Sequence, residues 1–148
     1  MSQLPAKQWS ILLVDGDVCH DQRIEEVFAK THYDLCVAHS CEEAIQVIRA
    51  FGWPHLIVTE RHFCNGMDGL QFSQLVRDLS DVPIIMLSER IPTKWIAQAI
   101  DDFADDYMIK PVDPEMLLSR IRRVLRRIDF ASQVVPAYNG RFVPNYPT

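Results

Sequence analysis

The chain has 148 residues, 48% of them hydrophobic and 24% charged, which predicts one globular domain large enough to bury a core. It has no apolar run of about eighteen residues, and its first residues, MSQLPAKQWS, lack the apolar segment of a signal peptide, so we expect a cytoplasmic protein that does not bind a membrane. A net charge of −5 argues against a nucleic-acid-binding surface on the chain itself.

Short apolar runs alternate with amphipathic segments along the chain. The expected strands are 11–15, 34–39, 55–60, 83–88 and 106–110. The expected helices are 18–30, 40–51, 70–79, 92–103 and 114–127. Ser40, followed by Glu43 three residues later, predicts a capping box, and Asp113 before Pro114 predicts another helix start.

The strand segments are continuously apolar rather than alternating, which is typical of a sheet covered by helices on both faces. Right-handed crossovers then predict a (βα)₅ fold, a doubly wound five-stranded parallel sheet in a three-layer α/β sandwich. Residues 1–9 are interpreted as an N-terminal extension and 10–128 as the domain. Residues 129–148 hold three prolines and no helical period, and are interpreted as a linker or tail.

Four of the expected strands end on polar residues, namely Asp15, Glu60, Ser88 and Lys110. Ligands of open parallel sheets gather beyond the carboxyl ends of the strands, so these side chains should share one pocket. Carboxylates, a hydroxyl and an ammonium there favour phosphoryl transfer with a divalent cation. The position after Asp15 is Gly16, however, and the central carboxylate is a glutamate. The pattern predicts a site that keeps its outline and has lost its chemistry.

The four cysteines, Cys19, Cys36, Cys41 and Cys64, have no CxxC spacing, and we expect reduced thiols. Cys36 falls in an expected strand and should belong to the core. His62 and Cys64 are too few ligands for a metal site.

Three segments, PHLIVTE, GMDGLQF and FADDYMIKPVDPEMLLSRIRRVLRR, together carry a family resemblance. Over about residues 10–127 the chain resembles the receiver domain of a two-component response regulator, a CheY-like domain with a flavodoxin-type fold. The resemblance is strongest to the subfamily that carries a winged-helix DNA-binding domain (OmpR/PhoB-type). It implies a regulatory function rather than an enzyme, and an effector domain that would follow residue 148.

The resemblance assigns roles to individual positions. Asp15 matches the first acid of the family, and Ser88, Tyr107 and Lys110 match its switch residues and lysine. Gly16 stands where a direct Mg²⁺ ligand belongs, and Glu60 stands where the phosphorylated aspartate belongs. We therefore expect no cofactor, with Mg²⁺ binding doubtful. Asp17 is interpreted as a helix cap, with metal rescue as the alternative.

Glu60 has two interpretations. Its longer side chain reaches toward Lys110 and Ser88 and would imitate a phosphorylated aspartate, with Ser88 directed into the pocket and Tyr107 buried. Alternatively, Glu60 and Lys110 form a plain ion pair and the domain never switches.

The resemblance also implies a homodimer through the fourth helix, fifth strand and fifth helix. Asp106 would meet Arg120, and Asp101 with Asp105 would meet Arg122, across a two-fold axis. A further ion pair of the family is replaced by Ile96 and Met116, which we expect to strengthen the contact. The alternative is that the arginines form an ordinary solvated helix face.

These features predict a phosphorylation-independent receiver that mediates dimerisation and regulation of an attached DNA-binding transcription regulator. The alternative is a stand-alone signalling adaptor that uses the same face. A cognate histidine kinase or another signalling protein is a further partner, and DNA would be bound only through the effector domain. Residual phosphotransfer stays open, whereas a mononucleotide binder is disfavoured because DGDVCHD after the first strand is acidic.

Overall fold

Five parallel strands and five helices alternate along the chain, and the computed structural model describes residues 8–16, 18–90 and 93–134. The strands are β1 (Ser10–Val14), β2 (Asp34–Ala38), β3 (Leu56–Glu60), β4 (Ile84–Ser88) and β5 (Asp106–Ile109). The helices are α1 (Val18–Phe28), α2 (Cys41–Phe51), α3 (Gly69–Leu79), α4 (Lys94–Phe103) and α5 (Pro114–Val134). No helix in the described ranges is long and apolar enough to cross a membrane.

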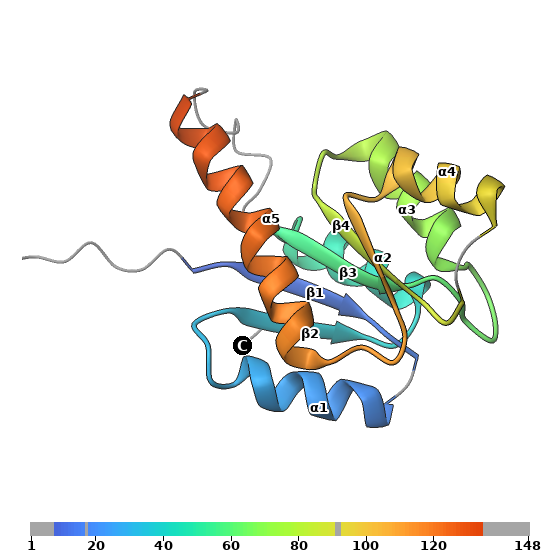
Figure 1. The fold of residues 1–148 in the computed structure, drawn as a ribbon, viewed down its shortest axis with the longest axis horizontal. Coiled ribbons are helices and arrows are strands. Elements are labelled where there is room, and N and C mark those ends of the chain that lie inside the picture. Colours follow the sequence, from blue (N-terminus) through green and yellow to red (C-terminus); the bar gives the residue numbers. More distant parts are fainter. Residues whose placement is uncertain (1–7, 17, 91–92, 135–148) are drawn as a thin grey trace, which may run out of the picture.

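The strands form one sheet in the order β2-β1-β3-β4-β5, with every neighbouring pair parallel (Figure 1). Helices α1 and α5 pack together on one face of the sheet, and α3 and α4 pack together on the other face, where α2 also lies. This arrangement confirms the predicted doubly wound three-layer sandwich. All four strand ends expected to carry the site therefore open at one edge of the sheet.

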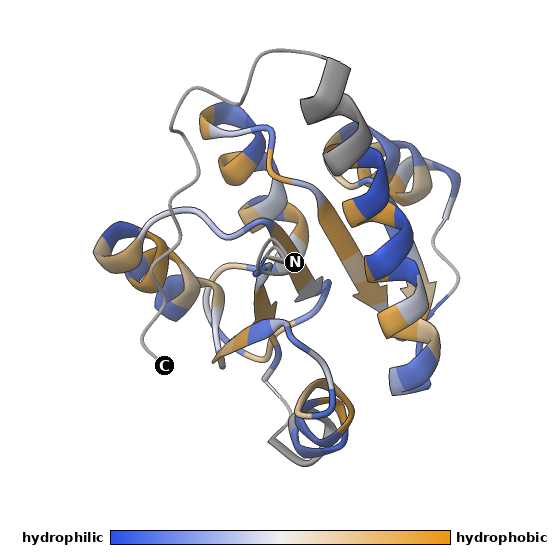
Figure 2. Ribbon diagram, turned by 90° about the vertical axis from the view of Figure 1, so that its left-hand side faces the viewer, coloured by the Kyte–Doolittle hydropathy of each residue, from blue (hydrophilic) through white to orange (hydrophobic). Residues whose placement is uncertain are grey.

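Burial explains why the strand segments are apolar throughout. In β1, Ile11 and Leu13 pack toward α1 and α5, whereas Leu12 and Val14 pack toward α2 and α3, as the two-residue period of a strand requires. All four side chains are at most 1% exposed. Figure 2 shows the hydrophobic strands between helices whose outer sides are hydrophilic. The sheet therefore lies between two apolar clusters.

The helix starts follow the sequence closely. Ser40 Oγ accepts a hydrogen bond from the Glu43 amide at 3.0 Å, as predicted. The return bond differs, because Glu43 Oε2 accepts from the amide of His39, one residue earlier. Asp113 Oδ1 accepts from the amide of Glu115 at 3.1 Å and caps α5. Sequence analysis missed a complete capping box at α3, between Asp68 and Gln71.

Helix α5 is longer than predicted, because it continues to Val134 instead of ending near Arg127. The prediction gave too much weight to the prolines of the last segment. A proline disfavours helix at its own position and at the residue before it, and the first proline here is Pro136. Residues 129–134, assigned to the tail, are thus helical. The rest of the expected tail, residues 1–7 and Pro92 lie outside the described residues.

Candidate functional site at the carboxyl edge of the sheet

The structure brings the four predicted strand-end residues together at one edge. Asp15 directly follows β1, Glu60 and Ser88 are the last residues of β3 and β4, and Lys110 directly follows β5. Asp15, Glu60 and Ser88 are only 0%, 7% and 1% exposed. Three polar side chains are thus withdrawn from water at the end of an apolar sheet, where each requires a partner.

Glu60 at the end of β3 obtains its partners from residues that follow β1 and β5. Its Oε1 forms an ion pair with Lys110 Nζ, and its Oε2 accepts a hydrogen bond from the Gly16 amide at 3.3 Å. The two side chains of the ion pair are 10% and 18% exposed, so solvent screens the pair only weakly. An ion pair at this place is what the second interpretation expects, and its further claim that the domain never switches stays a prediction. The ion pair joins the ends of β3 and β5, and the hydrogen bond from Gly16 joins the end of β1 to them.

Ser88 is buried, but its hydroxyl forms hydrogen bonds with the loop that follows β4. Ser88 Oγ donates to the Arg90 carbonyl at 2.9 Å and accepts from the Arg90 amide at 3.4 Å. Tyr107, the residue expected to become buried in an active-like state, is 37% exposed. The buried Tyr107 of the first interpretation is therefore not seen in this structure, in which the Glu60 oxygens contact Lys110 and Gly16 and the serine hydroxyl contacts its own loop. The structure therefore lacks the buried Tyr107 that is expected of a phosphorylated receiver, although Ser88 is buried.

The loop between β3 and α3 is pinned onto the site at Gly69. The Gly69 amide donates to the Arg61 carbonyl at 2.8 Å, and a Cβ at position 69 would lie 1.8 Å from the Glu60 carbonyl oxygen. Only glycine permits this approach. Upstream, Glu42 of α2 accepts from the Met67 amide at 2.6 Å, and this hydrogen bond lowers the pKa of the Glu42 carboxyl. The loop is thus fixed by hydrogen bonds at Met67 and at Gly69.

Unlike Gly69, Gly16 does not lie where an added Cβ would clash. Its φ is not positive, and an added Cβ would lie 3.6 Å from the Phe63 ring and 3.8 Å from the His39 carbonyl oxygen, which are ordinary contacts. The backbone at this position therefore has room for a Cβ atom. Gly16 itself supplies no carboxylate to the site.

The remaining donor set does not fit the Mg²⁺ ion that the family implies. Asp15 supplies a buried carboxylate, Gly16 supplies none, and the Glu60 carboxylate is paired with Lys110. Mg²⁺ requires near-octahedral oxygen ligands and is usually held by at least one or two free carboxylates. Among the residues that the structure describes, no three His, Cys, Asp or Glu side chains cluster closely enough to hold a metal. Asp17, the proposed cap, lies outside them.

The cysteines differ in their surroundings. Cys41 is fully buried at the start of α2, and burial, reinforced by the charges of Glu42 and Asp68, raises its pKa to about 12. Cys36, expected in the core, is only half-buried against the α2–α3 cluster, and its pKa is raised mainly by burial. Cys64 is exposed in the loop after β3, and the Cys19 side chain lies outside the described part.

Two of the three acidic residues of the expected dimer face, Asp105 and Asp106, have partners within the same chain. Asp106 Oδ2 pairs with Arg120 Nη1 at 2.8 Å. Asp105 Oδ2 lies 3.5 Å from Arg77 Nη2 and accepts from the Ile84 amide at 2.9 Å. Asp101 is exposed on α4. The Asp106–Arg120 pair thus forms within one subunit, whereas the sequence interpretation placed it between two.

Arg122 does not join this group. Arg120 and Met116 line a hollow with β5, whereas Arg122 lines another hollow with Trp9 and Tyr33. Two residues along a helix turn the side chain by about 200°, so Arg120 and Arg122 face opposite ways. The sequence interpretation placed Arg122 on the side of α5 that carries Arg120, near the acids of α4 and β5, whereas in the structure it lies on the other side of the helix. Helical periodicity alone could have shown this.

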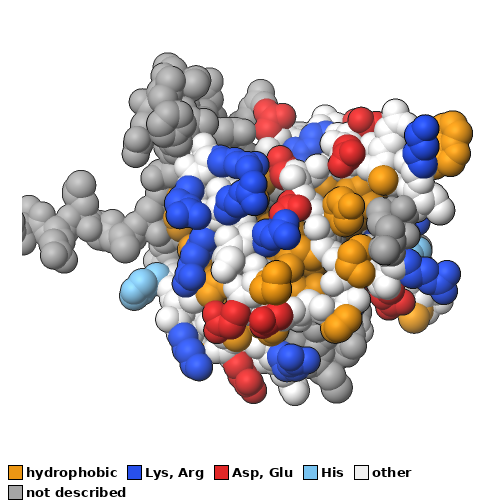
Figure 3. Space-filling view, in the orientation of Figure 1, with side chains coloured by type: hydrophobic (Ala, Val, Ile, Leu, Met, Phe, Trp, Pro, Cys, Tyr) orange, Lys and Arg blue, Asp and Glu red, His pale blue; other side chains and the backbone are white. Residues whose placement is uncertain are grey.

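Large apolar side chains are exposed between α4 and α5. Trp95 is 82% exposed, Met116 54% and Ile109 38%, while Ile96 is half-buried. Figure 3 shows hydrophobic side chains gathered on this face beside Lys and Arg over α5, with Asp and Glu at their edges. A shallow hollow of about 450 Å³ lies over β5 at its centre. We call the side chains of Trp95, Ile96, Tyr107, Ile109 and Met116 the α4–β5–α5 patch.

Comparisons with known proteins agree with the geometry. Residues 11–122 match the family model described as the response regulator receiver domain. A probable transcriptional regulator ycf27 from Porphyridium aerugineum is 35% identical over 82% of this chain and 50% of its own length. The DNA-binding response regulator MtrA of Mycobacterium tuberculosis is 31% identical over 80% of this chain and 51% of its own. The chain thus spans about half the length of these relatives.

Solved structures give the same result. A two-component response regulator from Clostridium difficile matches with a TM-score of 0.74 and 30% identity, covering 82% of this chain and 99% of its own. The chemotaxis protein CheY4 of Vibrio cholerae matches with a TM-score of 0.71 at 24% identity, covering 80% of this chain and 99% of its own, which supports the fold alone.

Proposed function

The chain belongs to the family of response regulator receiver domains, and on this premise we propose that it is an atypical receiver that regulates without being phosphorylated. The observation that carries the proposal is the Glu60–Lys110 ion pair with Gly16 beside it. The Glu60 carboxylate, with one oxygen paired to an ammonium and the other bonded to a backbone amide, is a poor nucleophile, because both contacts stabilise its charge. The neighbouring position offers no carboxylate for a metal.

The geometry favours a fixed domain over an imitation of the phosphorylated state. Lys110 contacts Glu60 directly, and Ser88 is engaged by Arg90. A side-chain carboxylate carries less charge and fewer acceptor oxygens than a phosphoryl group, so it cannot hold both switch residues at once. Tyr107 accordingly stays partly exposed. In this proposal the regulatory state of the domain is set by its association with another protein chain rather than by phosphorylation.

The association surface is the α4–β5–α5 patch, and the proposed partner is a second copy of this chain. Met116 and Ile96 replace the charged residues expected there, and Trp95 and Ile109 extend the apolar area. Exposed aromatic and aliphatic side chains of this size mark protein contacts more often than solvent-facing surface. By helical period Arg123 and Arg127, rather than Arg122, lie on the Arg120 side of α5 and would rim the patch.

Within a longer protein the domain would regulate an attached DNA-binding effector and thereby transcription. This follows the relatives, which are named as transcriptional and DNA-binding regulators and are about twice as long as the aligned segment. In this proposal the domain acts as a regulator rather than an enzyme, and a cognate histidine kinase or another signalling protein is a further partner. A stand-alone adaptor that presents the same patch to another protein is the second candidate, because the patch does not depend on an effector.

Phosphoryl uptake tests the proposal. The wild-type chain is incubated with acetyl phosphate and Mg²⁺ beside the Gly16→Asp/Glu60→Asp variant, and intact mass is measured. We expect no phosphoryl adduct on the wild type and one on the double variant, because position 16 accepts a Cβ without a clash and the two aspartates restore the metal ligand and the nucleophile that the family pattern has there. A phosphorylated wild type contradicts the proposal. A double variant that stays unlabelled shows that these two residues are not the cause.

A further inference from the structure

A second hollow lies at the opposite, amino edge of the sheet. It has a volume of about 200 Å³ and is lined by Trp9, Tyr33, Arg122, Leu125 and Arg126. Trp9 directly precedes β1, Tyr33 directly precedes β2, and the other three residues come from α5. The hollow therefore forms where two strands begin beside the middle of a helix, away from the carboxyl-edge site.

The walls of this hollow are aromatic and rigid. The Trp9 ring stacks edge-on against His55, with ring centroids 4.9 Å apart, and His55 Nδ1 accepts from the Ser10 amide at 2.9 Å. The Tyr33 ring packs against Phe28, with centroids 6.1 Å apart. Leu125 is 2% exposed and belongs to the core. Rings fixed in this way offer apolar contact at little entropic cost.

The remaining wall is cationic. Arg122 and Arg126 are one helical turn apart and both exposed, so their guanidinium groups stand side by side at the hollow. Within the described part of the chain no carboxylate forms an ion pair with either of them. From Met116 to Ile128, α5 carries no acidic residue at all. This positive charge is local, because the whole chain has a net charge of −5.

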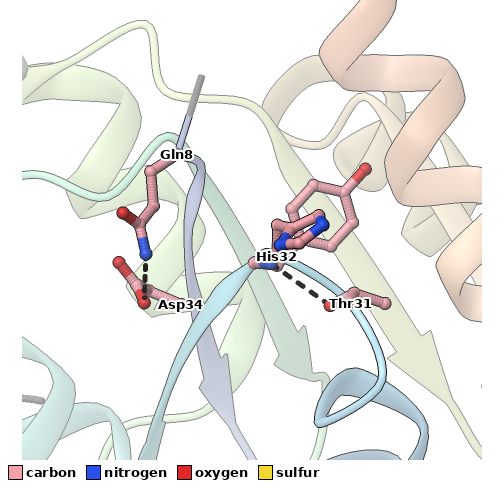
Figure 4. Close-up of a pocket in the computed structure, with 5 residues that line it drawn as sticks. Gln8, Thr31, His32 and Asp34 are labelled. Carbon is pink, nitrogen blue, oxygen red and sulfur yellow. Dashed lines mark hydrogen bonds between the residues drawn. The ribbon is translucent and has the colours of Figure 1, made fainter. Parts of the chain in front are cut away.

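A neighbouring hollow limits what can bind here. It has a volume of about 410 Å³, shares Tyr33, and is lined also by Gln8, Thr31, His32 and Asp34. Figure 4 shows Gln8 donating to Asp34, at 3.0 Å, and the turn closed by a bond of 3.2 Å from the Tyr33 amide to Thr31. A long polyanion would cross the Asp34 carboxylate, which repels it. A short anionic segment need contact only the two arginines.

We propose that the Trp9–Tyr33–Arg122–Arg126 hollow binds a short acidic peptide segment of a partner protein that carries an aromatic side chain. The aromatic ring would stack between Trp9 and Tyr33, and flanking carboxylates would pair with the two guanidinium groups, which match carboxylates in two-pronged geometry. The proposal is independent of phosphorylation and of the α4–β5–α5 patch, because Arg122 and Arg126 lie on another side of α5.

Binding of a defined probe tests this inference on the full chain. A fluorescein-labelled peptide with one phenylalanine among glutamates is titrated by fluorescence anisotropy. Arg122→Glu/Arg126→Glu should weaken binding at least about tenfold. The matched control, Arg23→Glu/Arg49→Glu, makes the same change of charge at exposed arginines of α1 and α2 that do not line the hollow, and should weaken peptide binding less than about threefold.

A second comparison isolates the aromatic contact. Tyr33→Ala should weaken the phenylalanine peptide but leave a peptide with alanine in its place unchanged, with circular dichroism showing that the variant is folded. Equal losses in the two arginine variants, or no saturable binding by the wild type, overturn the proposal. So does equal competition by oligothymidylate of the same charge, which indicates a general polyanion surface, or by inorganic phosphate, which indicates a free-anion site.

Discussion

The carboxyl edge of the sheet and the α4–β5–α5 patch use their side chains in opposite ways. At the edge, the polar groups are buried and bonded to one another, with Glu60 joined to Lys110 and to the Gly16 amide, and Ser88 joined to Arg90. On the patch, Trp95 is 82% and Met116 54% exposed. The difference shows that the polar residues at the carboxyl edge bond to one another inside the domain, whereas the apolar residues of the patch lie on its surface.

If the carboxyl edge is structural, its tightest contact should be the most sensitive to change. Gly69→Ala should lower the free energy of unfolding by at least about 3 kcal/mol, because the added methyl overlaps the Glu60 carbonyl. The control is Gly16→Ala, whose methyl meets only ordinary contacts and should change stability by less than about 0.5 kcal/mol. Urea denaturation measures both. Similar values for the two variants would show that the α3 start is not fixed against β3.

The ion pair gives the next largest expected effect. Lys110→Met should cost about 2–3 kcal/mol, because it leaves the buried Glu60 carboxylate without its cation. Glu60→Gln should cost less, since the Lys110 side chain is the more exposed of the two. The double variant should be more stable than Lys110→Met alone. Additive losses in this cycle would mean that the pair contributes no coupling and that the edge is held by other contacts.

The smallest effect is expected for association on the patch. Met116→Glu or Ile96→Glu should weaken self-association by about 1–2 kcal/mol, because each places a charge in an apolar contact. Phe51→Glu is the matched control, an exposed apolar residue on α2, which packs against β1 and β2. Sedimentation velocity at micromolar concentration measures the dimer fraction. A monomeric wild type, or a dimer equally affected by Phe51→Glu, would place the association surface elsewhere.

Much of the fold and of the carboxyl-edge site could be predicted from the sequence, because these features depend on the chemistry of neighbouring residues. Apolar runs gave the five strands, and Ser40 and Asp113 gave two helix starts, since caps are read from neighbouring residues. The convergence of Asp15, Glu60, Ser88 and Lys110 followed from parallel strands that share one edge.

The errors came from contacts that the local pattern does not specify. A buried Tyr107 was expected only if Glu60 imitates a phosphoryl group, and in the structure the Glu60 carboxylate pairs with the Lys110 ammonium while Tyr107 stays partly exposed. Arg122 was placed by resemblance to a motif, although its angular position on α5 puts it beside Trp9. The amino-edge hollow was not predicted, because it joins residues from three elements of no shared motif.

The added length of α5 has a consequence for geometry. The helix holds 21 residues and so measures about 31 Å, and its last residues extend beyond the sheet in Figure 1. A continuous helix fixes the direction in which each residue points as well as its distance along the axis, because each residue is rotated about the helix axis by about 100° relative to the one before it. The backbone of residues 129–134 therefore has a defined angular position relative to the rest of α5. Inserting one residue after Ile128 would turn these residues by about 100°, more than a quarter of a revolution, whereas inserting about four residues would nearly restore their original direction.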